Sequence, residues 1–437
     1  MSLAMPEIHE ERLANGATVV VARRPGVPLA AARLQVRAGA ALDPPGRFGL
    51  AQMVAMVARR GAGARSGRRL DDLVESQGAH LSASADEDAA VYSLSAPVEA
   101  LSSLLGPLVD LARAPSFPPA EFERLRRREL AALAHDADEP GLIADRAMLL
   151  EAYVGHPYGH AVEGRVKDMG TMRRADALAF HRRHYGPTLT TLVLTGPLDV
   201  GMALAEARRR LGRWKATVED PPDWPSPAPA PRRVVVVDKP DATQTQIRLA
   251  APGFPRRSPD YFPAAVANAV LGGGFTSRLV EAIRVNRGLS YGVRSRFAMS
   301  RSTGLFTLSS FTKNETAGEL VQVALDEIAR FRDEGPSAAE VERATSYLAG
   351  LYPMSLETHD QWADRLADLQ LYGYGLDEVR DYRERVRAVT AAAAHEVGRR
   401  RFPADTGVIL AVGPARQVVA QLERFGPVRV VPVRRVL

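Results

Sequence analysis

The spacing of hydrophobic and polar residues in the first half of the chain predicts strands at both ends and helices between them. Strands are expected at 18–22 and 31–38, joined through a Pro25-Gly26 turn, and again at 191–195. Polar and apolar residues alternate over 80–85 and 89–96, which predicts an antiparallel pair. A three-to-four-residue period predicts helices at 48–60, 70–77, 98–114, 120–135 and 142–154, with a further one ending near 187. This order of elements is typical of an α+β fold.

A proline-rich stretch interrupts the pattern in the middle of the chain. Six prolines fall within residues 220–231, which excludes a helix and disfavours a central strand. We therefore expect an extended linker at 220–232. It separates an N-terminal domain, 1–219, from a C-terminal domain, 233–437.

The pattern of the first half returns after the linker. Pro25 and Pro240, each following a valine-rich strand, are 215 residues apart. Near the end of each half, Arg183-His184-Tyr185 is similar to Arg400-Arg401-Phe402, at an offset of 217. Two matches with nearly one offset predict a duplicated α+β unit of roughly 210 residues.

Composition is that of a globular protein and leaves the compartment open. The chain is 46% hydrophobic and 25% charged, and it has no apolar run of eighteen residues, which excludes a membrane span. The absence of cysteine excludes disulfides and cysteine-based zinc sites or nucleophiles. Met1-Ser2-Leu3 is typical of an expression leader. The compartment stays open between bacterial cytoplasm and periplasm, with the cytoplasm slightly favoured.

The net charge of +6 raises the question of nucleic-acid binding. The basic residues are nearly all arginine and lie among acidic neighbours, which indicates genomic codon bias rather than a phosphate-binding track. The densest cluster, 124–128, is flanked by glutamates on a helical pattern, so we expect a solvated helix face; a partner contact is the alternative. A nucleic-acid function would need a continuous arginine stripe on the folded surface, and we expect none.

The helix at 48–60 contains a segment that resembles a metal-binding motif. Residues 49–56 read Gly-Leu-Ala-Gln-Met-Val-Ala-Met, similar to the Gly-Leu-Ala-His-x-x-Glu-His of M16 (pitrilysin, or inverzincin) metallopeptidases. In that motif two imidazoles on one helix face bind zinc and the glutamate reaches the bound water. Gln52 and Met56 stand at the histidine positions and Ala55 at the glutamate position. The third zinc ligand of the family, a later glutamate, falls on Ala132. The resemblance therefore implies an M16 fold without its zinc.

The alternative is an ordinary core helix that never held a motif. Against it, segments on both sides are also similar to the family: 42–46, 61–66, 78–84, 156–160 and 184–187. The remaining histidines do not rebuild a metal site. His156 and His160 are separated by Pro157 and Gly159, which disfavour a shared helix face. His181 and His184 lack a carboxylate at a matching spacing, and packing is the favoured interpretation for them.

The second half contains a glycine-rich segment followed by a helix. Gly272, Gly273 and Gly274 by themselves indicate only a tight turn at a helix start, with Thr276 or Ser277 as cap. The segment resembles the second-half signature of the M16 family, with Arg284 and Tyr291 at the positions of its Arg/Tyr pair. In relatives the pair donates hydrogen bonds to the substrate carbonyl and its oxyanion, and the glycine loop recognises substrate. The alternative makes Arg284 a helix-face ion pair and Tyr291 a core residue.

The resemblance implies two duplicated, LuxS/MPP-like M16 domains, each an antiparallel-rich mixed sheet with helices packed on it, in a clam-shell arrangement. It further implies a non-catalytic subunit of a heterodimeric M16B zinc peptidase. Arg284 and Tyr291 would act on the site of a partner that carries the His-x-x-Glu-His motif and the zinc, and the loop would bind the peptide substrate. No peptidase activity is expected from the chain alone, and without the partner it could form a homodimer. The alternative is a structural or peptide-binding scaffold without a role in catalysis.

Overall fold

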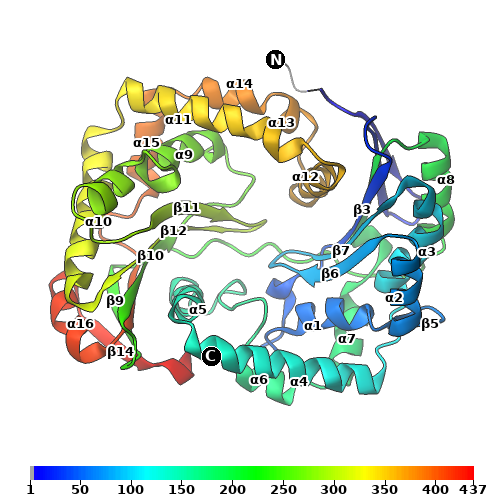
Figure 1. Cartoon of the computed structure of the whole chain (residues 1–437), viewed down its shortest axis with the longest axis horizontal. Helices are drawn as coiled ribbons and strands as arrows, with labels where there is room; N and C mark the ends of the chain where they lie inside the picture. Colours follow the sequence, from blue (N-terminus) through cyan, green and yellow to red (C-terminus); the bar gives the residue numbers. More distant parts are fainter. Residues whose placement is uncertain (1–3) are drawn as a thin grey trace. The chain divides into compact units, whose positions relative to one another are not determined.

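A computed structural model describes residues 4–437, which form two compact units, each built on a six-stranded mixed sheet (Figure 1). The first unit comprises the chain up to Ala131, residues 161–222 and residues 353–380. The second comprises residues 132–160, 223–352 and 381–437. The predicted α+β class is confirmed. The first unit includes residues 353–380 from the second half of the chain, and the second unit includes residues 132–160 from the first half. The domain boundaries at 219 and 233, which assume that each half folds separately, stay a prediction.

The sheet of the first unit has the strand order β1-β2-β8-β3-β7-β6. Neighbouring strands are antiparallel, except that β2 and β8 are parallel. The antiparallel pair predicted over 80–96 is confirmed as β6 and β7. The bounds are β1 (Glu7–Arg12), β2 (Thr18–Arg23), β3 (Leu29–Val36), β6 (His80–Ala85), β7 (Ala90–Pro97) and β8 (Thr190–Gly196).

The sheet of the second unit repeats this order as β14-β9-β13-β10-β12-β11. Strands β9 and β13 are parallel, as β2 and β8 are in the first sheet, so the duplication predicted from the sequence is confirmed. The units differ at one edge, where β1 is antiparallel to β2 but β14 is parallel to β9. The bounds are β9 (Arg233–Asp238), β10 (Gln244–Pro252), β11 (Val293–Met299), β12 (Gly304–Lys313), β13 (Val408–Gly413) and β14 (Val428–Pro432).

The helices of the first unit follow the predicted pattern with small shifts at their ends. Residues 48–60 form α1 (Leu50–Ala58), preceded by the short helix that spans Ala40–Leu42. A two-stranded ribbon, β4 (Gly61–Ala62) and β5 (Arg65–Ser66), follows α1. The other helices are α2 (Gly67–Ser76), α3 (Leu101–Arg113), α4 (Pro119–His135), α6 (Val166–Thr171), α7 (Arg174–His184), α8 (Val200–Leu211), α12 (His359–Tyr372) and α13 (Asp377–Arg380).

The second unit contains two short π-helices where the sequence predicted one helix start. They span Ala269–Gly273 and Val280–Val285, so Gly272 and Gly273 lie in the first of them and Gly274 directly follows it. Single π turns occur often at functional sites. The α-helices are α5 (Pro140–Ala152), α9 (Tyr261–Asn268), α10 (Ala317–Glu334), α11 (Ala338–Leu351), α14 (Tyr382–Arg387), α15 (Ala391–Arg401) and α16 (Ala415–Leu422).

Each sheet packs against one helix that comes from the other half of the chain. Helix α5 lies on β10 and β13, and α12 lies on β3 and β8 (Figure 1). Ile143, Ala144 and Ala147 of α5 form one buried cluster with alternate residues of β9, among them Val235 and Val237. Alternate strand residues point to opposite faces, so α5 covers one face of this sheet. With both faces covered, the central strands are continuous apolar runs.

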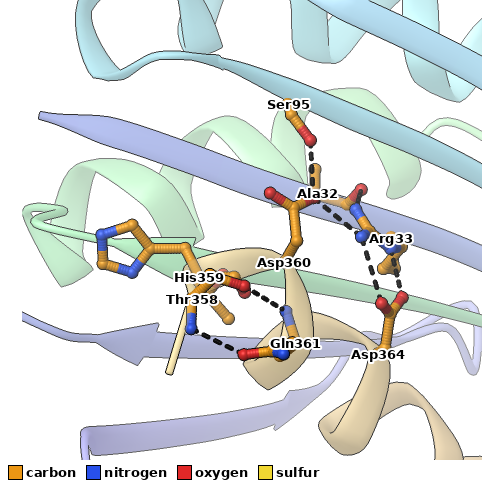
Figure 2. Close-up of polar contacts among 9 residues, drawn as sticks. Ala32, Arg33, Ser95, Thr358, His359, Asp360, Gln361 and Asp364 are labelled. Atoms are coloured by element: carbon orange, nitrogen blue, oxygen red, sulfur yellow. Dashed lines mark hydrogen bonds and ion pairs between the residues drawn. The ribbon is translucent and has the colours of Figure 1, made fainter. Parts of the chain in front are cut away.

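A buried arginine in each sheet holds the exchanged helix. Arg33 of β3 donates from Nε to Asp364 at 2.5 Å and from Nη2 to Asp360 at 2.8 Å, both on α12 (Figure 2). Arg248 of β10 donates from Nε to Asp145 of α5 at 2.6 Å. Arg33 and Arg248 are 215 residues apart, which is the offset of the duplication. The two arginine–aspartate contacts therefore occupy equivalent positions in the two duplicated units.

The proline-rich segment runs over the second unit without regular structure. Between α8 and β9 the described chain forms only an isolated bridge, from Pro231 to Thr406. Trp224 packs edge-on against Tyr158 with ring centroids 5.9 Å apart, and the carbonyl of Pro225 lies 3.1 Å from His156 Nε2. Among residues 4–437 none of the helices has the length and apolar character that crossing a bilayer requires.

Candidate functional site

The start of α1 is fixed by a buried carboxylate. Asp43 accepts hydrogen bonds from the backbone N–H groups of Gly49 at 2.7 Å, Leu50 at 3.2 Å and Ala51 at 2.8 Å. Gly49 has a φ of 96°, a conformation that glycine adopts without a steric penalty. Burial raises the pKa of Asp43 to about 8, while the three N–H groups act in the opposite direction. This anchor sets the position of the next turn of α1.

Gln52 and Met56 lie one turn apart on the half-exposed side of α1, while Ala55 is fully buried. The Gln52 side-chain oxygen accepts a hydrogen bond from the backbone N–H of Ala85, the last residue of β6, at 2.6 Å. The amide therefore ties the helix to a strand at the edge of the sheet. Ala132, on α4, is exposed.

The side chains at these four positions do not fit a zinc ion. They offer one amide oxygen, which is already bonded to Ala85, and one thioether, whereas zinc sites use imidazole, thiolate or carboxylate. Within residues 4–437 no three His, Asp or Glu side chains form a group that could hold a metal ion.

His156, His181 and His184 are engaged in packing. His181 Nε2 lies 2.7 Å from the carbonyl oxygen of Ala112, and the ring of His184 packs against Phe180 with centroids 4.7 Å apart. Burial, with Arg183 nearby, lowers the pKa of His184 to about 4, so this ring is neutral at pH 7. His156 packs between Tyr153 and Tyr158 next to the linker. These contacts agree with the packing interpretation made from the sequence.

The three glycines at 272–274 have different surroundings. A Cβ at Gly272 would lie 2.6 Å from Leu279 Cδ1 and 3.0 Å from the backbone nitrogen of Ser295, and one at Gly273 would lie 2.8 Å from Asn268 Nδ2. At Gly274 the nearest atom would be 3.7 Å away. Gly272 and Gly273 thus allow close packing, and Gly274 alone of the three lines a pocket of about 180 Å³.

The structure brings Arg284 and Tyr291 together, as the resemblance implied. The Arg284 guanidinium carbon lies 4.8 Å from the centre of the Tyr291 ring. Tyr291 is 80% exposed. Among the residues described, neither the guanidinium nor the phenol has a hydrogen-bond or ion-pair partner. The alternative of a helix-face ion pair and a core tyrosine is therefore wrong, and both groups are free to donate to a ligand.

Phe275 joins this pair and was missed in the sequence. Its ring centre lies 5.7 Å from the Arg284 guanidinium carbon, and its side chain is 83% exposed. It also lines the pocket with Gly274. A large aromatic residue directly after three glycines was the available signal, but its exposure depends on the fold. Neither proposed cap is used, because no side chain caps the π-helix at Val280–Val285.

Known protein families and relatives match this chain over most of its length. Residues 18–165 match insulinase (peptidase family M16), and residues 171–348 match the peptidase M16 inactive domain. A zinc protease of Rickettsia bellii, itself uncharacterized, is 24% identical over 79% of this chain and 83% of its own length. A probable mitochondrial-processing peptidase subunit beta of Schizosaccharomyces pombe is 25% identical over 81% of this chain and 80% of its own.

Solved structures share the fold. The crystal structure of a peptidase M16 inactive domain from Pseudomonas fluorescens superimposes with a TM-score of 0.87 and 25% identity, covering 93% of this chain and 98% of that one. Two adjacent family matches, the duplicated sheets and this superposition lead to one assignment. The chain belongs to the peptidase M16 family.

Proposed function

We propose that the chain is the non-catalytic, substrate-binding subunit of a heterodimeric M16B zinc peptidase. A partner with an intact His-x-x-Glu-His motif supplies the zinc, and this chain supplies Arg284 and Tyr291 to the peptide at that site. The observation that carries the proposal is the contact between half-exposed Arg284 and exposed Tyr291, whose donor groups have no hydrogen-bond or ion-pair partner among residues 4–437. The donor-poor positions on α1 support it, because the motif of active relatives is replaced at Gln52, Ala55 and Met56.

The chemistry required of the pair is hydrogen-bond donation. A guanidinium and a phenol both donate hydrogen bonds to oxygen. These hydrogen bonds become stronger when the carbonyl oxygen becomes a negatively charged oxyanion. Cation–π contact at an exposed site is worth only about 0.5–1 kcal/mol. The Arg284–Tyr291 contact is therefore weak enough to open when a substrate carbonyl competes for the guanidinium. A relative named as one subunit of a processing peptidase supports a divided enzyme.

Reconstitution with a candidate partner tests the proposal. A His-x-x-Glu-His protein of the same genome is mixed with this chain, and cleavage of a peptide library is followed. We expect cleavage only in the mixture, and Arg284→Ala lowers kcat by about 10²-fold, as for loss of one oxyanion donor. Tyr291→Phe, which keeps the ring and removes the hydroxyl, gives a loss in the same direction.

Arg399→Ala is the matched control, because this exposed arginine of α15 lies outside the proposed site. Its turnover should equal that of the unmodified complex. If Arg284→Ala and Tyr291→Phe also leave turnover unchanged in an active complex, the chain is a scaffold without a role in catalysis. Cleavage by the chain alone would contradict both readings.

A further inference from the structure

A small pocket beside the glycine-rich segment has walls from two elements of the second unit. One wall is the π-helix at Ala269–Gly273 with the residues that follow it, and the other is α11, which packs against that π-helix. The volume is about 180 Å³, and the lining residues are Ala269, Val270, Gly274, Phe275, Thr276, Glu340, Arg343, Ala344 and Tyr347. Pockets for whole small molecules hold roughly 300–1,000 Å³, so this one has room for a single side chain rather than for a cofactor.

Helix α11 presents one of its faces to the pocket. Positions 340, 343, 344 and 347 follow the spacing i, i+3, i+4 and i+7, which places side chains on the same side of a helix. A capping box fixes the first turn of this helix, because the Ser337 hydroxyl accepts from the Glu340 backbone N–H at 3.2 Å and the Glu340 carboxylate accepts from the Ser337 backbone N–H at 2.8 Å. The wall formed by α11 is therefore held in place at its start.

The pocket is apolar inside and has two aromatic rings at its open side. Val270 and Ala344 are buried, whereas Phe275 is 83% and Tyr347 is 48% exposed. Exposed aromatic side chains gain free energy when a ligand removes them from water, and aromatic rings attract one another edge to face or offset-stacked. The pocket is thus suited to a large apolar side chain, above all an aromatic one, between the two rings.

The pocket also has one positive charge without a partner. Arg278 donates to both carboxylate oxygens of Glu340, at 2.7 and 2.8 Å, so the charge of Glu340 is balanced. Arg343 is exposed, and within residues 4–437 its guanidinium has neither a hydrogen bond nor an ion pair. A guanidinium binds a carboxylate with two parallel hydrogen bonds. A ligand that fills the pocket therefore gains most if a carboxylate lies beside its apolar side chain.

We propose that this pocket binds one aromatic side chain of a peptide, and that Arg343 binds a carboxylate directly next to that side chain. The carboxylate belongs either to a neighbouring Asp or Glu or to the C-terminus of the peptide, and both offer the guanidinium the same chemistry. That the peptide is the substrate rests on the proposed function, in which Phe275 joins the pocket to Arg284. The binding itself needs neither zinc nor the partner.

Fluorescence anisotropy of labelled peptides measures binding to the purified full chain. The main probe is Gly-Gly-Phe-Glu-Gly-Gly with an amidated C-terminus. Replacing its phenylalanine by alanine should weaken binding by about 10- to 100-fold, as for the loss of one large buried apolar side chain. Replacing its glutamate by glutamine should weaken binding by about two- to fivefold, as for an exposed ion pair. A third replacement puts lysine in place of the glutamate.

Two further peptides separate the sources of the carboxylate. Both consist of five glycines followed by phenylalanine, one with a free C-terminal carboxylate and one amidated. The free acid should bind more tightly than its amide if the peptide C-terminus reaches Arg343. Whichever of the Phe-Glu peptide and the free acid binds more tightly identifies the source of the carboxylate.

Two variants of the chain test the pocket residues. Phe275→Ala, which removes an exposed ring, should weaken binding of the main probe by about three- to tenfold. Arg343→Glu should bind the Phe-Glu peptide more weakly and the Phe-Lys peptide more tightly than the unmodified chain does, a gain that loss of folding cannot produce. Arg399→Glu is the control of equal charge change, because it is exposed on α15 and does not line the pocket. Circular dichroism checks that all variants remain folded.

Equal binding of the phenylalanine and alanine peptides, or unchanged binding by Phe275→Ala, would overturn the inference. An Arg343→Glu variant with the same preference between the glutamate and lysine peptides as the unmodified chain would also contradict it. If peptide binding fails while turnover in the complex still depends on Arg284, only this inference fails. If peptide binding holds while turnover ignores Arg284, only the proposed function fails.

Discussion

At the scale of residues, the glycines at 272–274 differ in whether they are packed against neighbours or open to a pocket. Gly272 lies against β11 and Leu279, so it has no room for a side chain, whereas Gly274 opens into the pocket beside Phe275. Three adjacent glycines are chemically identical, so nothing in the sequence ranks them. The proposed substrate contact of this loop is accordingly expected at Gly274 rather than at Gly272.

Alanine substitutions test this difference. Gly272→Ala should lower the free energy of unfolding by about 1–3 kcal/mol, since the added methyl group overpacks a filled site. Gly274→Ala should change it by no more than about 0.5 kcal/mol, as at an open surface position. Urea unfolding of both variants measures the values. Equal losses would show that the space at Gly274 is filled.

The Arg278–Glu340 pair beside the pocket makes part of the stability depend on pH. Arg278 donates from Nε and Nη2 to the two carboxylate oxygens at 2.7 and 2.8 Å, which lowers the Glu340 pKa from 4.5 to about 2. Since the folded pKa is depressed, the contribution is complete above pH 4.5 and is lost as pH falls toward 2.

Thermal melts between these pH values check the Arg278–Glu340 contribution. The melting temperature of Glu340→Gln should fall less steeply with acid than that of the unmodified chain. Glu342→Gln, an exposed position on the same helix, is the control and should keep the full slope. Parallel curves for all three proteins would mean that the pair adds no pH dependence.

At the scale of elements, α5 and α12 differ most from the sequence prediction, because each packs on a sheet formed by the other half of the chain. The sequence predicted a helix over 142–154 and the structure has α5 there, but its apolar face packs on strands more than eighty residues further along the chain. Periodicity indicates that a helix has an apolar face without indicating what covers it. The duplicated arginines Arg33 and Arg248 supply the polar part of each docking.

Removing the carboxylates that hold Arg33 tests this docking. The Arg33 side chain is 6% exposed, so Asp360→Ala/Asp364→Ala leaves a buried guanidinium without a carboxylate and should cost about 3 kcal/mol. Arg33→Met should cost less, because no buried charge remains. Trp362 of α12 is buried and reports unfolding in urea by its fluorescence. A larger loss for Arg33→Met would contradict the explanation.

At the scale of the whole molecule, the M16 assignment suggests a zinc protease, whereas the α1 side chains do not suit zinc. Relatives are described as zinc proteases, yet Gln52, Ala55, Met56 and Ala132 do not fit zinc. The family assignment therefore does not carry an activity to this chain. What the fold retains is a pair of sheets and, in the second unit, Arg284 of a π-helix beside Tyr291, which precedes β11.

Metal analysis tests this at the level of the intact protein. Chain purified and dialysed with zinc should contain far less than one zinc per molecule by plasma mass spectrometry. Its melting temperature should not change with EDTA, because a metal that binds only the folded state would stabilise it. A tightly bound zinc whose removal lowers the melting temperature would show that other side chains bind it.

The sequence by itself determined the α+β class and most of the elements in the first half, because these depend on residues close together in the chain. It also determined the duplication, because the two halves repeat the same local patterns at nearly one offset. It also determined which atoms stand at the motif positions of α1. Only the tertiary structure decided which helix covers which sheet and that Phe275 joins Arg284 and Tyr291. Those outcomes depend on packing between segments distant in sequence, which local periodicity does not record.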